Sequence, residues 1–317
     1  MLGPAGTSGA PHWAGAPRTA LALHGGAGAF SASRIPGERV EEMRRDLGSA
    51  LEAGAAVLER GGPALDAVVA AVQVLEDSRV FNAARGAVLR RDGSVRLDAS
   101  VMCGATQRAA GVCLVRKVQN PVRLARALLE REREVLLCGD EADELAARLG
   151  LPLQPPDYFI TDYRREQLAR LHERAEEEGQ TVGAVALDAA GHLAAATSTG
   201  GTTNARISRI GDSPILGAGT WASDASCAVS ATGAGEYFLR AAFAHDVHAR
   251  LLWKGMSLDA AAREALAHVA RLGGHGGCVA IDRQGKIAAP FDTLAMPRAW
   301  LDESGQRQVR VLEPDPV

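Results

Sequence analysis

The chain has 317 residues, of which 47% are hydrophobic and 23% are charged. This length suits one large α/β domain or two smaller ones, and the composition is ordinary for a soluble globular protein. The net charge of −3 gives no reason to expect a nucleic acid or an acidic membrane as a partner, and no apolar run is long enough to span a bilayer.

Five cysteines stand singly along the chain, without any Cys-x-x-Cys pair: Cys103, Cys113, Cys138, Cys227 and Cys278. An odd number of scattered cysteines indicates reduced thiols in a cytoplasmic protein, and it argues against a disulfide framework or a zinc site. Residues 1–18 are rich in Gly, Pro, Ala and Ser and lack the basic-then-apolar order of a signal peptide. We therefore predict a disordered tail there.

The first part of the chain predicts a strand, two helices and a hairpin. A short apolar strand over residues 19–23 leads into a glycine loop that begins at His24. Apolar residues recur at helical spacing over residues 40–58, and residues 64–75 are apolar nearly all round, which is typical of a buried helix. An Arg-Asp-Gly turn within residues 86–97 indicates a hairpin.

The next part predicts a helix, a strand, a second helix and a linker. Asn120 and Pro121 are suited to cap and open a helix that continues to Leu129. A strand over residues 135–138 and a helix over 141–149 follow. Residues 151–180 begin with three prolines and continue with many charges, so we interpret them as a linker, part of which could be a frayed helix.

The second half of the chain begins with two nearly continuous apolar strands around a turn at residues 189–192, which is typical of strands covered on both faces. A glycine-bearing loop over residues 200–219 follows. The remaining predicted elements are a strand at 226–230, helices at 236–253 and 257–272, and a hairpin at 278–290. Strands, helices and strands in each half indicate two sheets between helix layers.

Thr181 lies where the polar linker meets the first of these apolar strands. If the peptide bond before it were cut, this residue would carry both a hydroxyl and a free α-amine. Such an amine has a reference pKa of about 8, so it can act as the general base for its own hydroxyl. On chemistry alone, a β-branched residue that simply opens a strand is the commoner interpretation.

Several separated motifs carry a specific resemblance, and they occur in the chain at residues 24–28, 81–83, 181–188, 194–201, 209–214 and 232–236. Together they resemble the plant-type asparaginases, also called isoaspartyl or β-aspartyl peptidases, which are N-terminal-nucleophile hydrolases. The resemblance covers residues 21–300. It implies an α/β (α+β) fold of the four-layer αββα type, with one domain over residues 19–317 that cuts itself into an α subunit, 1–180, and a β subunit, 181–317.

The resemblance also implies that Thr181 is the nucleophile of two reactions. Its hydroxyl first attacks the carbonyl of Gln180, giving an ester that water hydrolyses. It later attacks the side-chain carbonyl of a substrate, giving an acyl-enzyme that water resolves. Thr199 would hydrogen-bond the amine or hydroxyl of Thr181. Gln180 departs from the glycine or aspartate that commonly precedes the threonine, which puts the rate of self-cleavage in question.

Five further positions match residues that bind substrate in the resembled family. Arg209 would hold the α-carboxylate of an amino acid with two parallel bonds, and Asp212 would hold its α-ammonium. Thr232 and Gly233 would form the oxyanion hole, and Gly235 would line the pocket. Without the motif, a structural ion pair and a glycine-rich helix N-terminus would be the better explanations.

Supporting roles follow from the same resemblance. Gly25 and Gly26 would lie against the active-site strand, and Asn82 would add a donor near the nucleophile. A loop of backbone carbonyls would hold a structural sodium ion without a part in the chemistry, at Leu75, Glu76, Ser78, Phe81, Ala83 and Arg85. Ala84 replaces the usual glycine of this loop, so we expect the loop to be altered.

The leading interpretation is a cytoplasmic amidohydrolase, a homodimer of αβ protomers by analogy, that acts on L-asparagine and β-aspartyl dipeptides without a chemical cofactor. An N-acetylglucosaminyl-asparagine hydrolase of the same fold is the nearest alternative. From other classes, residues 217–222 formally fit a dinucleotide fingerprint of an oxidoreductase, and an uncleaved relative could only bind ligands. His245 and His248 suggest a metal, but no third ligand is evident.

Overall fold

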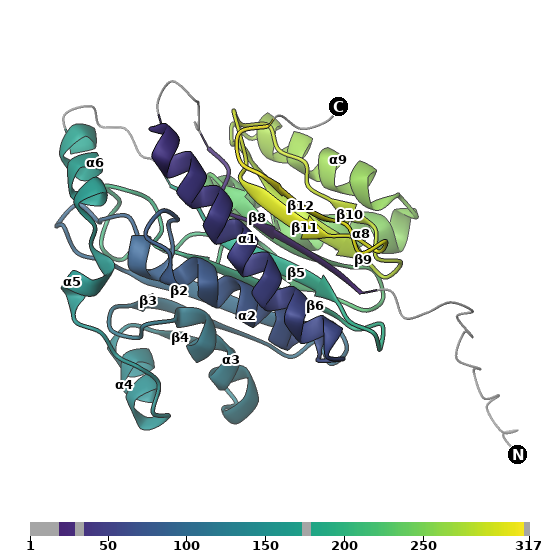
Figure 1. The fold of residues 1–317 in the computed structure, drawn as a ribbon, viewed down its shortest axis with the longest axis horizontal. Helices are drawn as coiled ribbons and strands as arrows, with labels where there is room; N and C mark the ends of the chain where they lie inside the picture. Colours follow the sequence, from purple (N-terminus) through teal and green to yellow (C-terminus); the bar gives the residue numbers. More distant parts are fainter. Residues whose placement is uncertain (1–18, 29–34, 173–178, 314–317) are drawn as a thin grey trace, which may run out of the picture.

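The computed structural model describes residues 19–28, 35–172 and 179–313 (Figure 1). Two β-sheets pack face to face in the described part, and helices cover the outer face of each. These four layers are the αββα arrangement that the resemblance implied. The predicted tail, residues 1–18, lies outside the described residues.

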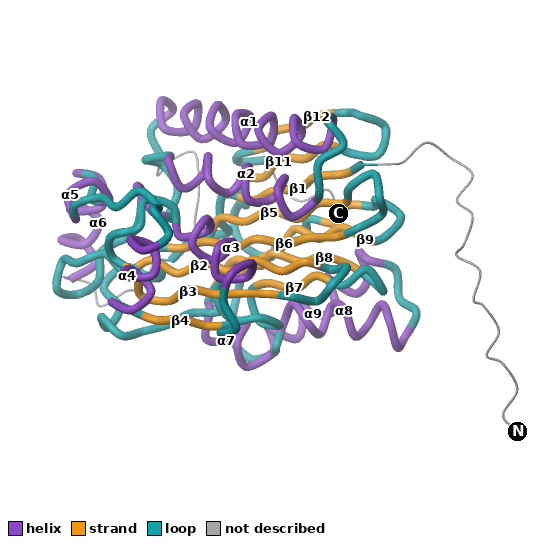
Figure 2. The backbone as a smooth tube through the Cα atoms, turned by 90° about the horizontal axis from the view of Figure 1, so that it is seen from below, coloured by secondary structure: helices purple, strands orange, loops and turns teal. Residues whose placement is uncertain are grey.

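The larger sheet has eight strands in the order β12-β11-β1-β5-β6-β2-β3-β4, which lie side by side in Figure 2. Every residue of β5 and β6 is buried, which explains their continuous run of apolar and small residues. The strands are β1 Ala20–His24, β2 Leu97–Cys103, β3 Ala109–Val115, β4 Leu136–Cys138, β5 Val182–Leu187, β6 Leu193–Thr199, β11 Arg298–Leu301 and β12 Arg307–Arg310.

The smaller sheet has four strands in the order β10-β9-β8-β7. These are β7 Thr220–Ala222, β8 Cys227–Gly233, β9 Gly276–Asp282 and β10 Ile287–Ala288. Small and β-branched residues dominate the apolar layer between the two sheets, among them Ala22, Val185, Ala195, Ala228 and Ile281. Because these side chains are short or compact, the two sheets can pack closely over the end of β5 where Thr181 lies.

Helices form the two outer layers. The larger sheet is covered mainly by α1 Gly37–Glu59, α2 Ala64–Asp77 and α3 Pro121–Arg131, and the smaller sheet by α7 Gly235–Ala241, α8 Phe243–Lys254 and α9 Leu258–Arg271. Short helices occupy the connections: the 3₁₀ turn η1 Ala84–Gly86, α4 Asp140–Arg148, α5 Pro156–Phe159 and α6 Asp162–His172. No helix in the described ranges is both long and apolar enough to cross a membrane.

The predicted hairpin over residues 86–97 is wrong in its first arm. A tight turn is present, since the Arg90 N–H donates to the Ser94 carbonyl at 2.8 Å, but residues 87–90 form no strand. The Val88 N–H instead donates to the Asn82 side-chain oxygen at 2.8 Å. This backbone segment is therefore held by a side chain of the active-site loop and not by a neighbouring strand.

Two other predictions need correction. The predicted linker over residues 151–180 contains the helices α5 and α6, and its residues 173–178 lie outside the described residues. The helix predicted over residues 236–253 is two helices, because Ala242 adopts a left-handed conformation with φ of 45° and ends α7 before α8 begins. Strand β3 and the last two strands, β11 and β12, were not predicted.

Candidate active site

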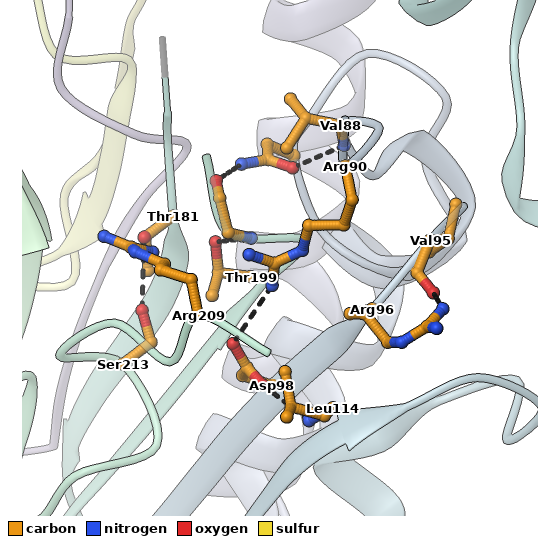
Figure 3. A network of polar contacts seen from close by, with 12 residues as sticks. Val88, Arg90, Val95, Arg96, Asp98, Leu114, Thr181, Thr199, Arg209 and Ser213 are labelled. Carbon is orange, nitrogen blue, oxygen red and sulfur yellow. Dashed lines mark hydrogen bonds and ion pairs between the residues drawn. The ribbon is translucent and has the colours of Figure 1, made fainter. Parts of the chain in front are cut away.

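Thr181 immediately precedes β5, in the middle of the larger sheet, where β5 is paired with β1 on one side and β6 on the other. Its side chain is buried, and its hydroxyl oxygen lies 3.2 Å from the hydroxyl oxygen of Ser213 (Figure 3). Ser213 belongs to the loop between β6 and β7. Ser213 lies within the motif at residues 209–214, but no role was predicted for it.

The carbonyl oxygen of Gln180 accepts two side-chain hydrogen bonds. Asn82 donates through Nδ2 at 2.5 Å, and Thr199 donates through Oγ1 at 2.8 Å. Two donors on one carbonyl oxygen polarise the bond and stabilise negative charge on that oxygen if the carbonyl carbon is attacked. The structure thus brings three predicted site residues, Asn82, Thr199 and Thr181, to the two ends of a single peptide group.

Both donors are themselves fixed in orientation. The Asn82 amide also donates to the Gly201 carbonyl at 2.8 Å, and its oxygen accepts the Val88 N–H. The Thr199 hydroxyl accepts the Gly201 N–H at 2.9 Å, which leaves its own proton for Gln180. Each donor is therefore preorganised by a second hydrogen bond before any reaction begins.

Arg209 and Asp212 line the same cavity, and the ion pair between them that was the alternative explanation does not form. The Arg209 guanidinium forms a two-pronged ion pair with Glu236, with Nε–Oε1 at 2.9 Å and Nη2–Oε2 at 3.0 Å. Asp212 is 3% exposed, and its Oδ2 has no hydrogen-bond partner among the described residues. Burial raises the pKa of Asp212 to about 6, against the opposing effect of Arg209.

Thr232, Gly233 and Gly235 lie at the end of β8 and the start of α7. The Thr232 hydroxyl accepts the Ala27 N–H at 3.0 Å, so its own proton remains available for donation. A Cβ atom at Gly235 would lie 2.7 Å from Asp212 Oδ1 and 2.9 Å from Arg209 Nη2. A side chain at Gly235, the first residue of α7, would therefore displace the ends of these two charged side chains.

The candidate residues line one small cavity of about 10 Å³, formed by Gly179, Gln180, Thr181, Thr199, Gly201, Thr202, Arg209, Asp212, Ser213 and Gly233. This volume is roughly that of one water molecule. A larger hollow of about 740 Å³ lies between α9, β10 and the β11–β12 hairpin, and none of the predicted site residues lines it. With the bond between Gln180 and Thr181 intact, the site has no room for an amino acid.

The glycine loop after β1 packs directly on this junction. A Cβ atom at Gly25 would lie 2.3 Å from the ring of Phe81, and one at Gly26 would lie 2.8 Å from Gln180 Cβ. Gly26 also has a φ of 109°, which favours glycine. The structure therefore places Gly26 against Gln180, the residue before Thr181, and Gly25 against Phe81.

A buried chain of hydroxyl groups runs between the two sheets from His24 to the loop that carries Ser213. The His24 Nε2 lies 3.0 Å from the first hydroxyl, and the last donates to the Ser213 carbonyl at 2.6 Å. Successive oxygens are 2.5 to 2.8 Å apart along Ser230, Thr197, Thr220 and Ser100. Sequence reasoning missed this chain because its members come from different strands.

Behind the Thr199 turn lies a buried ion pair that sequence reasoning also missed. Arg90 Nη2 is 3.8 Å from Asp98 Oδ2, and both side chains are completely buried (Figure 3). A Cβ atom at Gly201 would lie 2.6 Å from Arg90 Nη2. The absence of a side chain at Gly201 thus lets the guanidinium pack directly behind the loop that holds Thr199 and Asn82.

Comparison with known proteins decides the family. A family model described as asparaginase matches residues 17–311. The chain belongs to the asparaginase family. Its relatives include the isoaspartyl peptidases of Salmonella typhimurium and Escherichia coli, each 42% identical over 297 residues, with 89% of this chain and 95% and 92% of the relatives covered. A plant-type L-asparaginase of Pyrobaculum calidifontis is 41% identical over 296 residues, covering 89% of this chain and 96% of its own length.

The oxidoreductase alternative does not fit this asparaginase-family chain. A dinucleotide fingerprint must follow a strand and open a helix, so that the helix N-terminus meets the pyrophosphate. Here the second half of residues 217–222 is the strand β7 itself, which pairs antiparallel with β8. His245 and His248 pack against Trp221, with ring centroids 4.8 and 5.2 Å apart, and the described residues contain no group of three or more His, Cys, Asp or Glu that could hold a metal.

Residues 75–86 comprise the last turn of α2, the loop that carries Asn82, and the turn η1. Ala84 has a φ of 38°, so this position keeps a conformation that favours the glycine it lacks. Glu76 is completely buried, and its Oε1 accepts the Ser198 hydroxyl at 2.6 Å and the Val122 N–H at 3.0 Å. The loop is thereby attached to β6 one residue before Thr199.

Proposed function

We propose that this protein is a self-processing threonine amidohydrolase that hydrolyses β-aspartyl dipeptides and L-asparagine, releasing L-aspartate together with an amino acid or ammonia. The observation that carries the proposal is the peptide group of Gln180, whose carbonyl oxygen is held by Asn82 and Thr199 directly beside the Thr181 hydroxyl. The names of the relatives, isoaspartyl peptidase and plant-type L-asparaginase, support the substrate class.

In the first reaction the chain cuts itself. The Thr181 oxygen attacks the Gln180 carbonyl carbon, and the negative charge that develops on the carbonyl oxygen is stabilised by Asn82 Nδ2 and Thr199 Oγ1. The C–N bond then breaks to leave an ester between the two residues. Water hydrolyses this ester into the carboxylate of one fragment, 1–180, and the free hydroxyl and amine of the other, 181–317.

In the second reaction the new amine of Thr181 takes the proton of its own hydroxyl, and that oxygen attacks the side-chain carbonyl of the substrate. The α-carboxylate binds to Arg209 and the α-ammonium to Asp212, whose unpartnered buried oxygen suits a cation. Thr232 and Gly233 donate to the oxyanion. The C–N bond of the substrate then breaks, the protonated Thr181 amine gives its proton to the leaving nitrogen, and ammonia or an amino acid departs to leave the acyl-enzyme. Water attacks the acyl-enzyme, the Thr181 hydroxyl is restored, and L-aspartate is released.

Intact-mass measurement and a denaturing gel of the purified protein test this proposal. We expect two fragments that meet at Thr181, and hydrolysis of β-aspartyl dipeptides and L-asparagine by the cut protein. The Thr181→Ala variant should stay uncut and inactive. Thr181→Ser should still be cut, although more slowly, because serine supplies the same hydroxyl and, after cleavage, the same α-amine. Cleavage that persists in Thr181→Ala, or full activity in an uncut chain, would refute it.

The proposal extends to assembly and location. We propose a homodimer of two-piece protomers in the cytoplasm, and the odd number of scattered cysteines supports a reducing compartment. Sedimentation of the cut protein tests the first part: a particle of twice the protomer mass is expected, and a single protomer contradicts it.

A structural sodium ion in the loop over residues 75–86 is also part of the proposal. Neutral carbonyl oxygens are suitable ligands for a hard cation. The Ala83 carbonyl accepts the Gly86 N–H at 3.1 Å, which leaves its second lone pair for an ion. Such an ion would hold the loop that carries Asn82. A higher melting temperature in sodium chloride than in tetramethylammonium chloride is the expected result, and equal values contradict it.

A further inference from the structure

Self-cleavage requires a base that the mature enzyme does not need. In the uncut chain the nitrogen of Thr181 is an amide, which cannot accept the proton of the hydroxyl. The hydroxyl of Ser213, 3.2 Å away, can pass a proton on but cannot keep it. Asn82 and Thr199 both donate to the Gln180 carbonyl. A proton acceptor must therefore come from elsewhere.

His24 and Asp212 are two titratable side chains near this junction that could accept a proton, and they are unequal candidates. His24 has one nitrogen bound to Ser230, and burial lowers its pKa to about 3, so it is a weak base. Asp212 lines the same cavity of about 10 Å³ as Thr181 and Ser213. Its side chain is 3% exposed, and Oδ2 has no hydrogen-bond partner among the described residues.

A buried carboxylate oxygen without a partner is costly, so the cavity beside it is expected to supply one. The cavity volume is that of roughly one water molecule, and its walls are polar. A water there would meet the Asp212 oxygen on one side and the Thr181 and Ser213 hydroxyls on the other. Proton transfer through one water is an accepted geometry for a general base.

The charges around Asp212 come from three elements. Arg209, on the same loop, lowers its pKa, whereas Glu236 on α7 and Asp98 on β2 raise it. Burial is the largest effect, and it raises the pKa to about 6. The carboxylate is thus mostly ionised at neutral pH but more basic than an ordinary aspartate, and a base is most effective when its pKa lies near the working pH.

We propose that Asp212 is the general base of self-cleavage and takes the proton of Thr181 through one water in this cavity. The inference rests on the self-cleavage proposed above. As the Thr181 oxygen bonds to the Gln180 carbonyl carbon, its proton passes to the water, and the water gives a proton to Asp212.

The remaining steps need only these groups and a second water molecule. The electron pair of the C=O bond moves to the oxygen held by Asn82 and Thr199, and it returns as the C–N bond breaks. Asp212 gives its proton back through the water to the departing nitrogen of Thr181. A second water then hydrolyses the ester. After the cut, the same carboxylate is free to bind the ammonium of a substrate.

The test follows cleavage of newly synthesised chains in a cell-free translation reaction, by a timed denaturing gel from about pH 5 to about pH 8. Below about pH 6 the wild-type rate should fall by about tenfold per pH unit, because the base becomes protonated. Asp212→Asn should cut at least about 100-fold more slowly, with a rate that no longer depends on pH in this range. Asp212→Glu should recover part of the rate.

The matched control is Asp282→Asn, which makes the same change at a buried aspartate in the smaller sheet and should cut at the wild-type rate. A near-normal rate in Asp212→Asn, or a pH dependence that persists in it, overturns the inference. If that variant does not fold, a wild-type rate that is flat across the range overturns it. None of these results contradicts the proposed function, which is tested separately by cleavage of the wild-type chain at Thr181 and by the Thr181→Ala variant.

Discussion

His24 is the last residue of β1, which lies beside β5 in the larger sheet. Its side chain is completely buried, and burial lowers its pKa to about 3. Between pH 6.5 and pH 3 the unfolded chain binds a proton at this residue that the folded chain does not. The free energy of unfolding therefore falls as the pH falls through this window, by up to about 1.4 kcal/mol per pH unit from this residue. His24→Gln should reduce this slope.

Urea unfolding at several pH values measures the slope. His275→Gln is the control, because it makes the same change at a histidine whose side chain is 67% exposed. It should keep the wild-type slope. An equal slope in His24→Gln and the wild type would contradict the prediction.

Glu236 holds the Nε and Nη2 edge of Arg209, which fixes the guanidinium and leaves Nη1 for the carboxylate of a substrate. We expect Glu236→Gln to raise KM for L-asparagine by about tenfold with a smaller effect on kcat, because one charged partner of a two-pronged pair is lost. Steady-state kinetics of the cut protein measure this. The control is Glu264→Gln, which removes the carboxylate on α9 that pairs with Arg250 on α8 and should leave KM unchanged. A KM at or below the wild-type value in Glu236→Gln would contradict the expectation.

At the residue scale, the motifs located most of the candidate site but not the hydrogen-bond and ion-pair partners of its residues. Thr181, Thr199 and Asn82 converge on one peptide group, but Thr199 donates to the Gln180 carbonyl and not to Thr181 as predicted. Their catalytic roles stay predictions. Glu236 and Ser213 were missed as site residues because a hydrogen-bond partner depends on the path of the loop between β6 and β7. Such a path is set by contacts with β2 and β8, which a local pattern does not contain.

At the scale of elements, the break between α7 and α8 gives a stability prediction. Ala242 is exposed and has φ 45° and ψ 47°, a left-handed conformation in which an L side chain is strained. Ala242→Gly should therefore raise the free energy of unfolding by about 0.5–1 kcal/mol, after allowing for the greater entropy of glycine in the unfolded chain.

The control for this change is Ala249→Gly, in the interior of α8, which should lower the free energy of unfolding by a similar amount. Chemical denaturation of both variants decides the matter. If the two substitutions act in the same direction, the conformation assigned to Ala242 is wrong.

The helices α1, α2 and α3 were predictable from their apolar residues, and α3 also from Pro121 at its start. The predicted side-chain cap at Asn120 is wrong, because its amide donates to Asp77 at 3.0 Å and makes no capping hydrogen bond. The break at Ala242 was not predictable, since alanine is the best helix former and nothing local marks it. The false hairpin arm has a comparable cause: its backbone is held by the Asn82 side chain, a contact that no propensity records. Strands β11 and β12 were missed because four residues are too few to show alternation.

At the scale of the whole molecule, the proposed cut divides a single sheet between two fragments. Strands β1 to β4 belong to residues 1–180, and the other strands of the larger sheet to residues 181–317, yet β1 lies between β11 and β5, and β6 pairs with β2. We predict that the fragments co-elute in size-exclusion chromatography and separate only in concentrated denaturant. Separation in native buffer would contradict this.

The four-layer plan followed from the order of strands and helices together with the motifs. The interleaved strand order did not, because pairing between distant strands is decided by which faces they bury together, and residues such as Ala22 and Ala195 carry no mark of their partners. Only the assembled sheets show that the bond before Thr181 lies between strands of both fragments.

The cavity beside Thr181 has a volume of about 10 Å³, which admits a solvent molecule but no amino acid. The newly made protein is therefore a zymogen. Asparaginase activity should appear only after a lag that matches the appearance of the two fragments, and each molecule undergoes this activation once. Breaking the single bond between Gln180 and Thr181 is thus what makes room for a substrate.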